Sequence, residues 1–518
     1  MAETIPPITD FIDRWAREKP TVTAVSYGER SWTWGLWRER MLRNAAAQRA
    51  AGLVEGERIA FLDKNNPACL ETTLGCALAG TANAVINYRL SPSEISYIIN
   101  DSRARLLMIG AEFVDVVESI RDSLESVETI VVIGGNGDQY EGWLAAAAPA
   151  EPERRAHPDE CFLQLYTSGT TGHPKAAMLT HRSLAAHNAG AVRGFRFSED
   201  MVSMVAMPLF HVGGTSWAIA GMSVGGHTVV VREVVPPAVL DEIVDRKVTH
   251  AFFVPAVYGF FLDLPDVATR DYSALRCLGY GGSPMPLPLM RRCLATWDVD
   301  FYQVYGMTEM SGVFSVLGPA DHRDATHPER LVSAGHPLPG VVVKVVDPAT
   351  GDEVPPGETG EFWLQSQQHM LGYWNNTEAT AEALPGDDWL RSGDGGRVDA
   401  DGYLFIEDRV KDMIISGGEN VYPAEVERVL VEHPAVAEVT VIGIPDSKWG
   451  EQVKAVVVLA DDVVITETEL IAYARKHLAG YKCPKSVDFV AALPRSATGK
   501  VLKRELRKKY WEGVTLHG

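Results

Sequence analysis

Cysteine is scarce in this chain, and the few copies are widely spaced. None of the six forms a C-x-x-C pair; they are Cys69, Cys76, Cys161, Cys277, Cys293 and Cys483. This spacing argues against a disulfide scaffold and against a cysteine-based zinc site. In a long chain it is typical of reduced, mostly buried thiols in a cytoplasmic protein.

Two kinds of targeting segment are missing as well. The N-terminal residues lack a basic segment followed by an apolar run, so we expect no secretory signal. No stretch reaches the roughly 18–20 uninterrupted apolar residues of a membrane span, and the most apolar region, residues 201–231, is broken by Pro208 and His211. We therefore expect a cytoplasmic protein, with weak peripheral membrane contact and a homodimer both left open.

An excess of positive charge is absent too. The 518 residues carry 48 Lys/Arg against 68 Asp/Glu, and this net charge of −20 argues against nucleic acid as a partner. Residues 409–518 hold 16 Lys/Arg and 15 Asp/Glu, so the negative excess lies before residue 409. Because this length exceeds what one hydrophobic core supports, we predict two domains, residues 1–408 and residues 409–518.

The order of apolar and polar segments predicts an α/β fold. Short apolar runs at 106–109 and 129–133 are typical of buried parallel strands, and strand and helix patterns alternate through 226–254. This alternation favours a large domain of layered α/β sheets with helices on both faces. Short strands between Gly, Pro and Asp turns predict a small β subdomain over 335–408, and the last 110 residues predict a small α+β domain.

Two capping-box patterns predict where helices begin. Ser91 stands three residues before Glu94, and Thr466 stands three residues before Glu469. In such a box each side chain accepts a backbone N–H of the first helical turn, so helices are expected to start at both places.

One segment, Tyr166–Lys175 (YTSGTTGHPK), combines hydroxyl side chains, glycines and a final lysine. Glycines let backbone N–H groups approach a ligand and form an anion-binding nest, and the hydroxyls and the lysine add donors for phosphate oxygens. The spacing is not that of a Walker A loop, and a solvated loop is the alternative. The candidate phosphate-binding residues are Thr167, Ser168, Gly169, Thr170, Thr171, Gly172 and Lys175.

Further short motifs lie far apart along the chain. They are Gly281-Gly282-Ser283, Tyr305-Gly306-Met307-Thr308-Glu309, Ser392-Gly393-Asp394, Asp408-Arg409-Val410-Lys411-Asp412, Ser416-Gly417-Gly418-Glu419-Asn420 and the sequence PRSATGK at 494–500. In this order, and with the preceding loop, they resemble the adenylate-forming superfamily. That superfamily includes acyl-CoA and aryl-CoA ligases, firefly-type luciferases and peptide-synthetase adenylation domains; the likeness covers nearly the whole chain and is nearest to bacterial fatty-acyl-CoA ligases.

The resemblance implies a two-step, AMP-forming acid–thiol ligation. A carboxylic acid and ATP, with Mg²⁺, give acyl-AMP and pyrophosphate, and the thiol of coenzyme A then displaces AMP. The Thr167–Lys175 loop would hold the β- and γ-phosphates. Tyr305 would lie against adenine, and such stacking contributes roughly 1–3 kcal/mol. The other implied nucleotide contacts are Gly281, Gly282, Ser283, Gln303, Gly306, Met307 and, at the ribose, Asp394 and Arg409.

Four residues would carry the chemistry. Lys500 would lie between the carboxylate and the α-phosphate and offset their repulsion; one more cation of a basic C-terminal helix is the alternative. Thr308 would contact the α-phosphate or the carboxylate of the acid. Glu309 would bind Mg²⁺, which prefers carboxylate and phosphate oxygens. His211 would lie beside the acid, although a single histidine is more often a core residue.

The resemblance also implies a mobile C-terminal domain. Lys411 holds the hinge position, where backbone rotation would present a different face of this domain for each step. Gly417 and Gly418 would line the channel for the pantetheine arm of CoA, because a side chain there would block it.

The acyl pocket is predicted around Gly213 and Gly214. Plant coumarate ligases are similar here but carry a tyrosine in place of Gly213, so the glycine favours a longer cavity and an aliphatic acid of medium or long chain. The other candidate lining residues are Val254, Tyr258, Tyr280, Met307 and Val313. The alternatives are an aryl-CoA ligase for a cinnamate or benzoate, a luciferase-like oxidoreductase, an acyl-AMP ligase feeding a carrier protein, and an inactive binding module.

Overall fold

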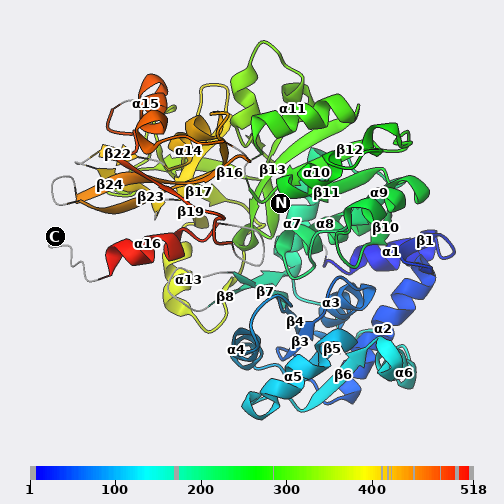
Figure 1. Cartoon of the computed structure of the whole chain (residues 1–518). Coiled ribbons are helices and arrows are strands. Elements are labelled where there is room, and N and C mark those ends of the chain that lie inside the picture. Colours follow the sequence, from blue (N-terminus) through cyan, green and yellow to red (C-terminus); the bar gives the residue numbers. More distant parts are fainter. Residues whose placement is uncertain are drawn as a thin grey trace. The chain divides into compact units, whose positions relative to one another are not determined.

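The computed structural model divides the chain into two compact units (Figure 1). Unit 1 holds Met1–Val342 and Leu364–Leu390, and unit 2 holds Val343–Trp363 and Arg391–Gly518. Both units mix helices and strands, which confirms the predicted α/β class with a large first part and a small C-terminal part. The domain boundary at residue 409 stays a prediction. The structure describes residues 7–167, 174–283, 285–409, 412–416, 419–421, 423–446, 450–461, 463–478, 480–495 and 501–512.

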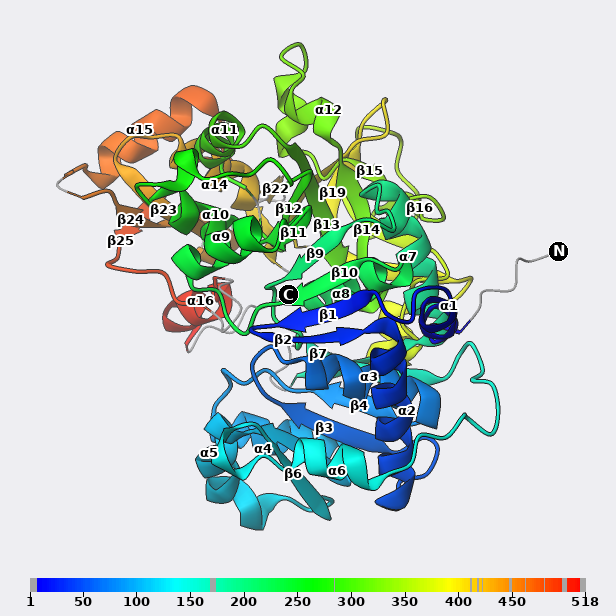
Figure 2. The ribbon, with the colours of Figure 1, turned by 90° about the vertical axis from the view of Figure 1, so that its right-hand side faces the viewer.

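The first sheet of unit 1 has nine strands in the order β15-β14-β13-β12-β11-β9-β10-β1-β2 (Figure 2). From β13 to β1 neighbours pair in parallel, and β2, β14 and β15 add antiparallel edges. The strands are β1 (Thr23–Tyr27), β2 (Arg30–Thr33), β9 (Val202–Val205), β10 (His227–Val230), β11 (His250–Phe253), β12 (Cys277–Gly281), β13 (Asp300–Met307), β14 (Gly312–Leu317) and β15 (His336–Pro337).

Helices cover both faces of this sheet, as parallel strands require. On one face, α9 (Pro236–Asp245), α10 (Pro255–Leu262) and α11 (Leu287–Thr296) enclose a core that contains Tyr258 and Tyr280. On the other, α8 (Val212–Ser223) packs on β9, β10 and β14, next to α7 (His181–Gly194). Because side chains alternate along a strand, β11 sends Phe253 to the first face and Phe252 to the second.

The second sheet of unit 1 has seven strands in the order β18-β8-β7-β4-β3-β5-β6. The predicted strands at 106–109 and 129–133 are confirmed as the parallel neighbours β5 and β6. β8 and β18 complete the sheet as antiparallel strands. The strands are β3 (Arg58–Leu62), β4 (Ala82–Val85), β5 (Leu106–Gly110), β6 (Thr129–Ile133), β7 (Cys161–Thr167), β8 (Lys175–Thr180) and β18 (Gly372–Tyr373).

Some of the remaining helices of unit 1 begin at recognisable capping signals. Ser91 and Glu94 form the predicted capping box at the start of α4, and Asn66 caps α3, which has Pro67 as its first residue. The remaining helices are α1 (Asp10–Glu18), α2 (Trp34–Ala50), α3 (Pro67–Ala79), α4 (Pro92–Ser102), α5 (Val114–Ile120), α6 (Tyr140–Ala146), α12 (Pro319–His322) and α13 (Thr377–Ala383).

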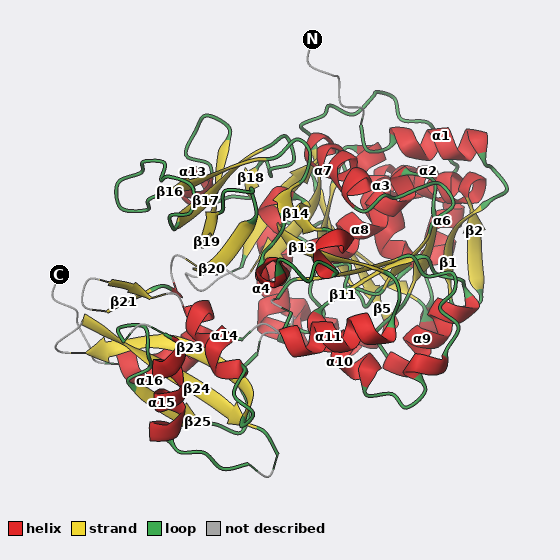
Figure 3. Cartoon of the chain, turned by 90° about the horizontal axis from the view of Figure 1, so that it is seen from above, coloured by secondary structure: helices red, strands yellow, loops and turns green. Residues whose placement is uncertain are grey.

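Two smaller sheets follow (Figure 3). The four-stranded one, β16-β17-β19-β20, lies within the range 335–408 predicted for the β subdomain, but β15 and β18 of that range belong to the two large sheets. Its strands are β16 (Val342–Val346), β17 (Gly360–Gln365), β19 (Trp389–Val398) and β20 (Leu404–Arg409). The other sheet contains β21 (Ile414–Ser416), β22 (Glu419–Val421), β23 (Val436–Asp446), β24 (Gly450–Leu459) and β25 (Ser486–Phe489). It packs with α14 (Pro423–Val431), α15 (Glu467–His477) and α16 (Lys503–Trp511).

The capping box predicted at Thr466 and Glu469 is present at the start of α15. Among the described residues, no helix combines the length and the apolar character needed to cross a bilayer.

Candidate active site

The predicted phosphate loop is held at its base by a β-hairpin. Thr167 is the last residue of β7, Lys175 is the first of β8, and the two are partners across the antiparallel pair. The Thr167 hydroxyl donates to the Lys175 carbonyl at 3.4 Å. The loop therefore starts and ends on adjoining strands of a buried sheet; its predicted residues Ser168, Gly169, Thr170, Thr171 and Gly172 lie outside the described residues.

Glu309 lies on a short 3-10 turn, η5 (Thr308–Met310), directly after β13. Its side chain is buried, and its Oε1 accepts a hydrogen bond of 2.7 Å from the hydroxyl of Tyr373. The second carboxylate oxygen has no partner among the described side chains. Met307 and Thr308, both half-buried, precede it on the same stretch. The turn thus holds a carboxylate with one oxygen fixed and one available.

This carboxylate suits Mg²⁺ in one specific way. Mg²⁺ is usually bound by one or two carboxylates together with substrate phosphates, rather than by a cage of protein ligands. Within the described ranges, no three His, Cys, Asp or Glu side chains lie close enough to hold a metal by themselves. An ion at Glu309 would therefore depend on the phosphate oxygens of a nucleotide for the rest of its coordination.

The glycines proposed for the adenine side have two different structural reasons. A side chain at Gly281 would collide with Val304 on the adjoining strand β13, so close strand packing alone demands glycine there. Gly282 has a positive φ of 77°, which favours glycine, and both it and Ser283 are exposed. A side chain at Gly306 would collide with the backbone of β14. Gly282, Ser283 and Gly306 are exposed and could meet a ligand, whereas Gly281 is buried.

Tyr305 and Gln303 lie on β13, in the strand that leads to Glu309. The Tyr305 ring is mostly buried and packs against Phe314, with 4.4 Å between the ring centroids. The Oε1 atom of Gln303 is buried and has no hydrogen-bond partner among the described residues. A buried amide oxygen without a donor is costly, which makes Gln303 a polar side chain on this strand that the described part of the fold leaves unsatisfied.

The two predicted ribose residues are neighbours in the four-stranded sheet. Asp394 on β19 is the register partner of Arg409 on β20. Asp394 is buried, and its backbone N–H donates to the Ser392 hydroxyl at 3.0 Å. The Arg409 side chain and the whole of Lys411, Gly417, Gly418 and Lys500 lie outside the described residues.

His211 has a local structural role that its sequence context did not reveal. It is the N-cap of α8, and its Nδ1 accepts the backbone N–H of Gly213 at 3.1 Å. Burial lowers the pKa of His211, which keeps the imidazole neutral at neutral pH and able to accept this bond. The cap fixes the first turn of α8, where Gly213 and Gly214 lie.

The space expected beside Gly213 is taken by an aromatic ring. A Cβ atom built on Gly213 would lie 3.2 Å from Cε1 of Phe252 and 3.3 Å from Nδ1 of His211. The Phe252 ring in turn packs on Trp217, with 5.7 Å between centroids. Gly213 therefore lies where α8 packs closely on β11, and the acyl pocket expected beside it stays a prediction.

Two of the predicted pocket residues belong to the core on the opposite face of the sheet. The Tyr258 hydroxyl donates to the Gly279 carbonyl at 2.7 Å, and the Tyr280 hydroxyl lies 2.8 Å from Nε2 of His322. Both side chains are fully buried among the residues that α9, α10 and α11 cover. They do not face Gly213, so neither is retained as a pocket residue. Val254 is half-buried and packs against the edge of the same core, whereas Val313 is half-buried on β14; both stay predictions.

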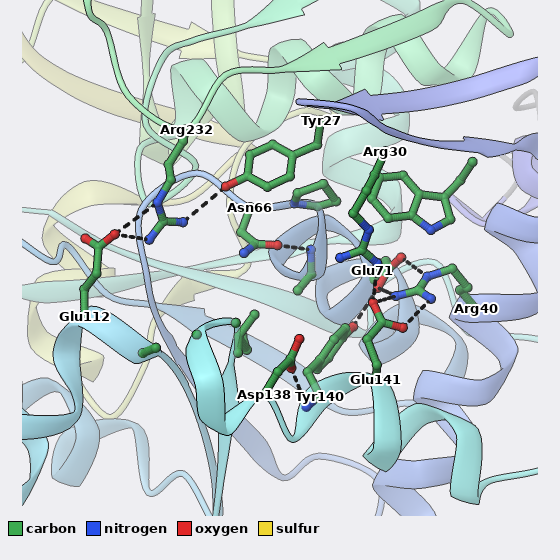
Figure 4. A pocket seen from close by; sticks show the side chains of 17 residues that line it. Tyr27, Arg30, Arg40, Asn66, Glu71, Glu112, Asp138, Tyr140, Glu141 and Arg232 are labelled. Atoms are coloured by element: carbon green, nitrogen blue, oxygen red, sulfur yellow. Dashed lines mark hydrogen bonds and ion pairs between the residues drawn. The ribbon is translucent and has the colours of Figure 1, made fainter.

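A cavity of about 350 Å³ lies elsewhere in unit 1, at the carboxyl ends of β3, β5 and β6 (Figure 4). None of the predicted site residues lines it. At one end, Arg232 donates to Glu112; at the other, Arg40 donates to Glu71 and Glu141 (Figure 4). Arg232 also donates to Asp63, which does not line the cavity. Tyr140 donates to Glu71 at 2.8 Å.

The positive and negative side chains around this cavity pair with one another. Glu71 is 1% exposed and Arg40 is 12% exposed. Burial lowers the pKa of Arg40, but the hydrogen bonds and charges of Glu71 and Glu141 more than offset it, and the net pKa is raised. Because each of these guanidinium groups already faces carboxylates, we interpret the cluster as a structural ion-pair network.

Comparison with known proteins places the chain in a family. The family described as AMP-binding enzyme matches residues 12–374, and the AMP-binding enzyme C-terminal domain matches residues 425–500. The first match covers well over half of the chain, including the hairpin, Tyr305 and Glu309.

Curated relatives and solved structures are similar over almost the full length. The fatty acid–[acyl-carrier-protein] ligase ScoC of Streptomyces coeruleorubidus is 40% identical over 501 residues, 96% of this chain and 95% of the relative. The feruloyl-CoA synthase of an Amycolatopsis species is 40% identical over 499 residues, 96% of this chain and 98% of the relative. The anthranilate CoA ligase AuaEII in complex with anthranoyl-AMP superposes with a TM-score of 0.87 at 31% identity, covering 98% of each chain. The chain therefore belongs to the AMP-binding enzyme family and is an AMP-forming acid–thiol ligase that works through an acyl-adenylate.

Proposed function

We propose that the chain adenylates a carboxylic acid with a compact apolar body, of the aryl type, and transfers it to coenzyme A. The observation that carries this substrate class is the position of Phe252. Its ring lies 3.2 Å from the Cβ position of Gly213, so an aromatic wall borders the predicted acyl pocket on this side. A flat aromatic wall suits the ring of an aryl acid, which is why we place the aryl acid before a medium- or long-chain fatty acid.

Two relatives support the choice of an aryl acid over a fatty acid. One is named a feruloyl-CoA synthase and another an anthranilate CoA ligase, and both names specify aromatic acids. The 40% identity to the feruloyl enzyme extends over both units of the present chain.

For the nucleotide, we propose the roles implied by the motif order. The loop from Thr167 to Lys175 would bind the phosphates, Tyr305 would stack on adenine, and Asp394 with Arg409 would bind the ribose. The unpartnered Oε1 of Gln303 supports an amino group nearby, because a ligand donor would satisfy it. Glu309 would bind Mg²⁺ through its available oxygen.

The C-terminal unit supplies the remaining parts of the proposal. Lys500 would stabilise charge during adenylation, Lys411 would be the hinge, and Gly417 with Gly418 would line the thiol channel. A homodimer and contact with a membrane surface stay predictions.

A second candidate function has the same two-step adenylation chemistry but a different acid and a different thiol acceptor. ScoC is named for a fatty acid and an acyl-carrier protein, and it is 40% identical to this chain. A fatty acid passed to a carrier-protein thiol is therefore the alternative.

Pyrophosphate–ATP isotope exchange across a panel of acids tests the substrate class. We expect cinnamates, benzoates or indole acids to support exchange with a higher kcat/KM than octanoate or palmitate. A clear preference for palmitate would contradict the aryl assignment and favour the second candidate. Thioester formation with CoA against a holo-carrier protein then decides the acceptor.

A further inference from the structure

We propose that Tyr373 is a positioning residue of the nucleotide site, which orients Glu309 towards Mg²⁺ and ties it to the phosphate-loop hairpin. The inference deepens the proposed function and rests on it. It assigns a role to a residue outside all of the motifs that indicated the chemistry.

The hydroxyl of Tyr373 fixes one half of the Glu309 carboxylate. Its bond to Oε1 is 2.7 Å long, and the carboxylate is buried. A metal-binding carboxylate needs such an outer partner, because a freely rotating side chain would lose its orientation when the ion binds. With Oε1 held, Oε2 is directed away from the phenol as the oxygen available to an ion.

The backbone around Tyr373 is attached to both parts of the site. We call residues 368–374 the clip. The Met370 N–H donates to the Glu309 carbonyl at 2.7 Å, and the Gln368 amide donates to the Met310 and Val313 carbonyls, each at 3.0 Å. The clip therefore holds the turn η5 and the start of β14 through their backbone carbonyls, while its Tyr373 holds the carboxylate of the same turn.

The other end of the clip is a strand of the hairpin sheet. Tyr373 is the register partner of Ala177 on β8, and the Trp374 N–H donates to the Ala176 carbonyl at 2.9 Å. Lys175 begins the same strand, and its ammonium lies 5.4 Å from the centroid of the Tyr373 ring. One side chain thus contacts the carboxylate proposed for the metal and the lysine that closes the phosphate loop.

This arrangement has a chemical consequence for a metal–nucleotide complex. A lysine and a magnesium ion that bind the same triphosphate must lie at a separation that matches its phosphate groups. Small errors in this separation weaken binding of the metal–nucleotide complex. Tyr373 sets that spacing because its ring and its hydroxyl move as one rigid group. A cation over an aromatic face is also attracted to it, which restrains Lys175.

The test uses equilibrium ATP binding, with and without Mg²⁺, and no turnover. Isothermal titration of the full chain with ATP in Mg²⁺ and in EDTA gives the factor by which Mg²⁺ tightens ATP. In Tyr373→Phe, which keeps the ring, we expect this factor to fall by roughly 10-fold, the scale for loss of an outer-shell partner, with ATP affinity in EDTA unchanged.

Two comparisons separate positioning from general damage. Trp374→Phe removes a clip hydrogen bond of 2.9 Å to the Asp101 carbonyl but touches neither Glu309 nor Lys175; it should lower the melting temperature and leave the Mg²⁺ factor unchanged. In a Glu309→Gln background, Tyr373→Phe should add nothing further, because the two residues act through one contact.

The outcomes distinguish this inference from the function beneath it. A wild-type chain that binds no ATP in either buffer would overturn both. Wild-type binding tightened by Mg²⁺, together with an unchanged factor in Tyr373→Phe or an equal fall in Trp374→Phe, would overturn the role of Tyr373 alone.

Discussion

The clip around Glu309 and the charged cavity in Figure 4 both bury carboxylates in unit 1, but they leave them in different states. Glu71 accepts from Arg40 and from Tyr140, so its two oxygens are bonded to neighbouring side chains. Glu309 accepts from Tyr373 through one oxygen only. A buried charge with all partners present stabilises a fold, whereas one with a vacancy can take a ligand. The cavity holds more charged groups, but they bind one another. Glu309 has a carboxylate oxygen without a hydrogen-bond partner among the described side chains, so Glu309 is the better candidate for a ligand site.

The largest effect on stability is expected when one member of the Arg40–Glu71–Glu141 ion-pair network is removed. Glu71→Leu leaves the guanidinium of Arg40 buried without its main partner, so the free energy of unfolding should fall by about 3–5 kcal/mol. Urea denaturation followed by circular dichroism measures it. The double variant Arg40→Met with Glu71→Leu should recover most of the loss, and a loss below about 1 kcal/mol in the single variant would contradict the structural role.

Acid should destabilise the chain through its buried histidines rather than through that network, and His322 is one of them. Burial lowers the pKa of His322 to about 4, whereas an unfolded histidine titrates near 6.5. Between about pH 6.5 and 4 the unfolded chain therefore binds a proton that the folded chain does not, and unfolding becomes easier as pH falls, by up to about 3 kcal/mol.

His322→Gln removes this contribution. The unfolding free energy of the variant, measured from pH 7 to pH 4, should fall less steeply than that of the wild type. Parallel curves would show that other groups, such as the cavity carboxylates, cause the acid sensitivity.

Replacing Glu309 should lower activity more than it lowers stability. Glu309→Gln should lower pyrophosphate–ATP exchange by about 100-fold, the scale for losing one preorganised charge-stabilising group. The unfolding free energy should change by less than about 1.5 kcal/mol, because a glutamine oxygen can still accept from Tyr373. Exchange within a factor of three of wild type would remove Glu309 from the metal site.

The smallest effect is expected at the rim of the cavity. Glu141 also pairs with Arg40, but it is 42% exposed, and exposed ion pairs contribute about 0–1 kcal/mol. Glu141→Gln should therefore cost less than about 1 kcal/mol in the same denaturation assay. A cost equal to that of Glu71→Leu would show that burial is not what separates the two glutamates.

Local signals in the sequence predicted the local structure well. The capping box at Ser91 and the apolar run at 129–133 both specify structure within a few residues, and both are confirmed. The motif order likewise predicted the family. Such features are readable because the partners are neighbours in the chain.

Contacts between segments that are distant in the sequence could not be predicted from local patterns. Tyr373 and Glu309 are 64 positions apart, and Arg232 and Asp63 are 169 apart. Neither pair shares a periodicity or a motif that would indicate contact. The same limit applies beside Gly213, where the ring of Phe252 comes from a strand that the local motif does not contain.

Lys500, the cation proposed for adenylation, should be needed for the first half-reaction and dispensable for thioester formation, because only the first brings a carboxylate against the α-phosphate. Measuring both half-reactions of Lys500→Ala tests it most directly, with ATP and acid for the first and with preformed acyl-AMP and CoA for the second. We predict a loss of more than about 100-fold in the first half-reaction and a rate close to wild type in the second. An equal loss in both, or an adenylation rate that is unchanged, would contradict the account.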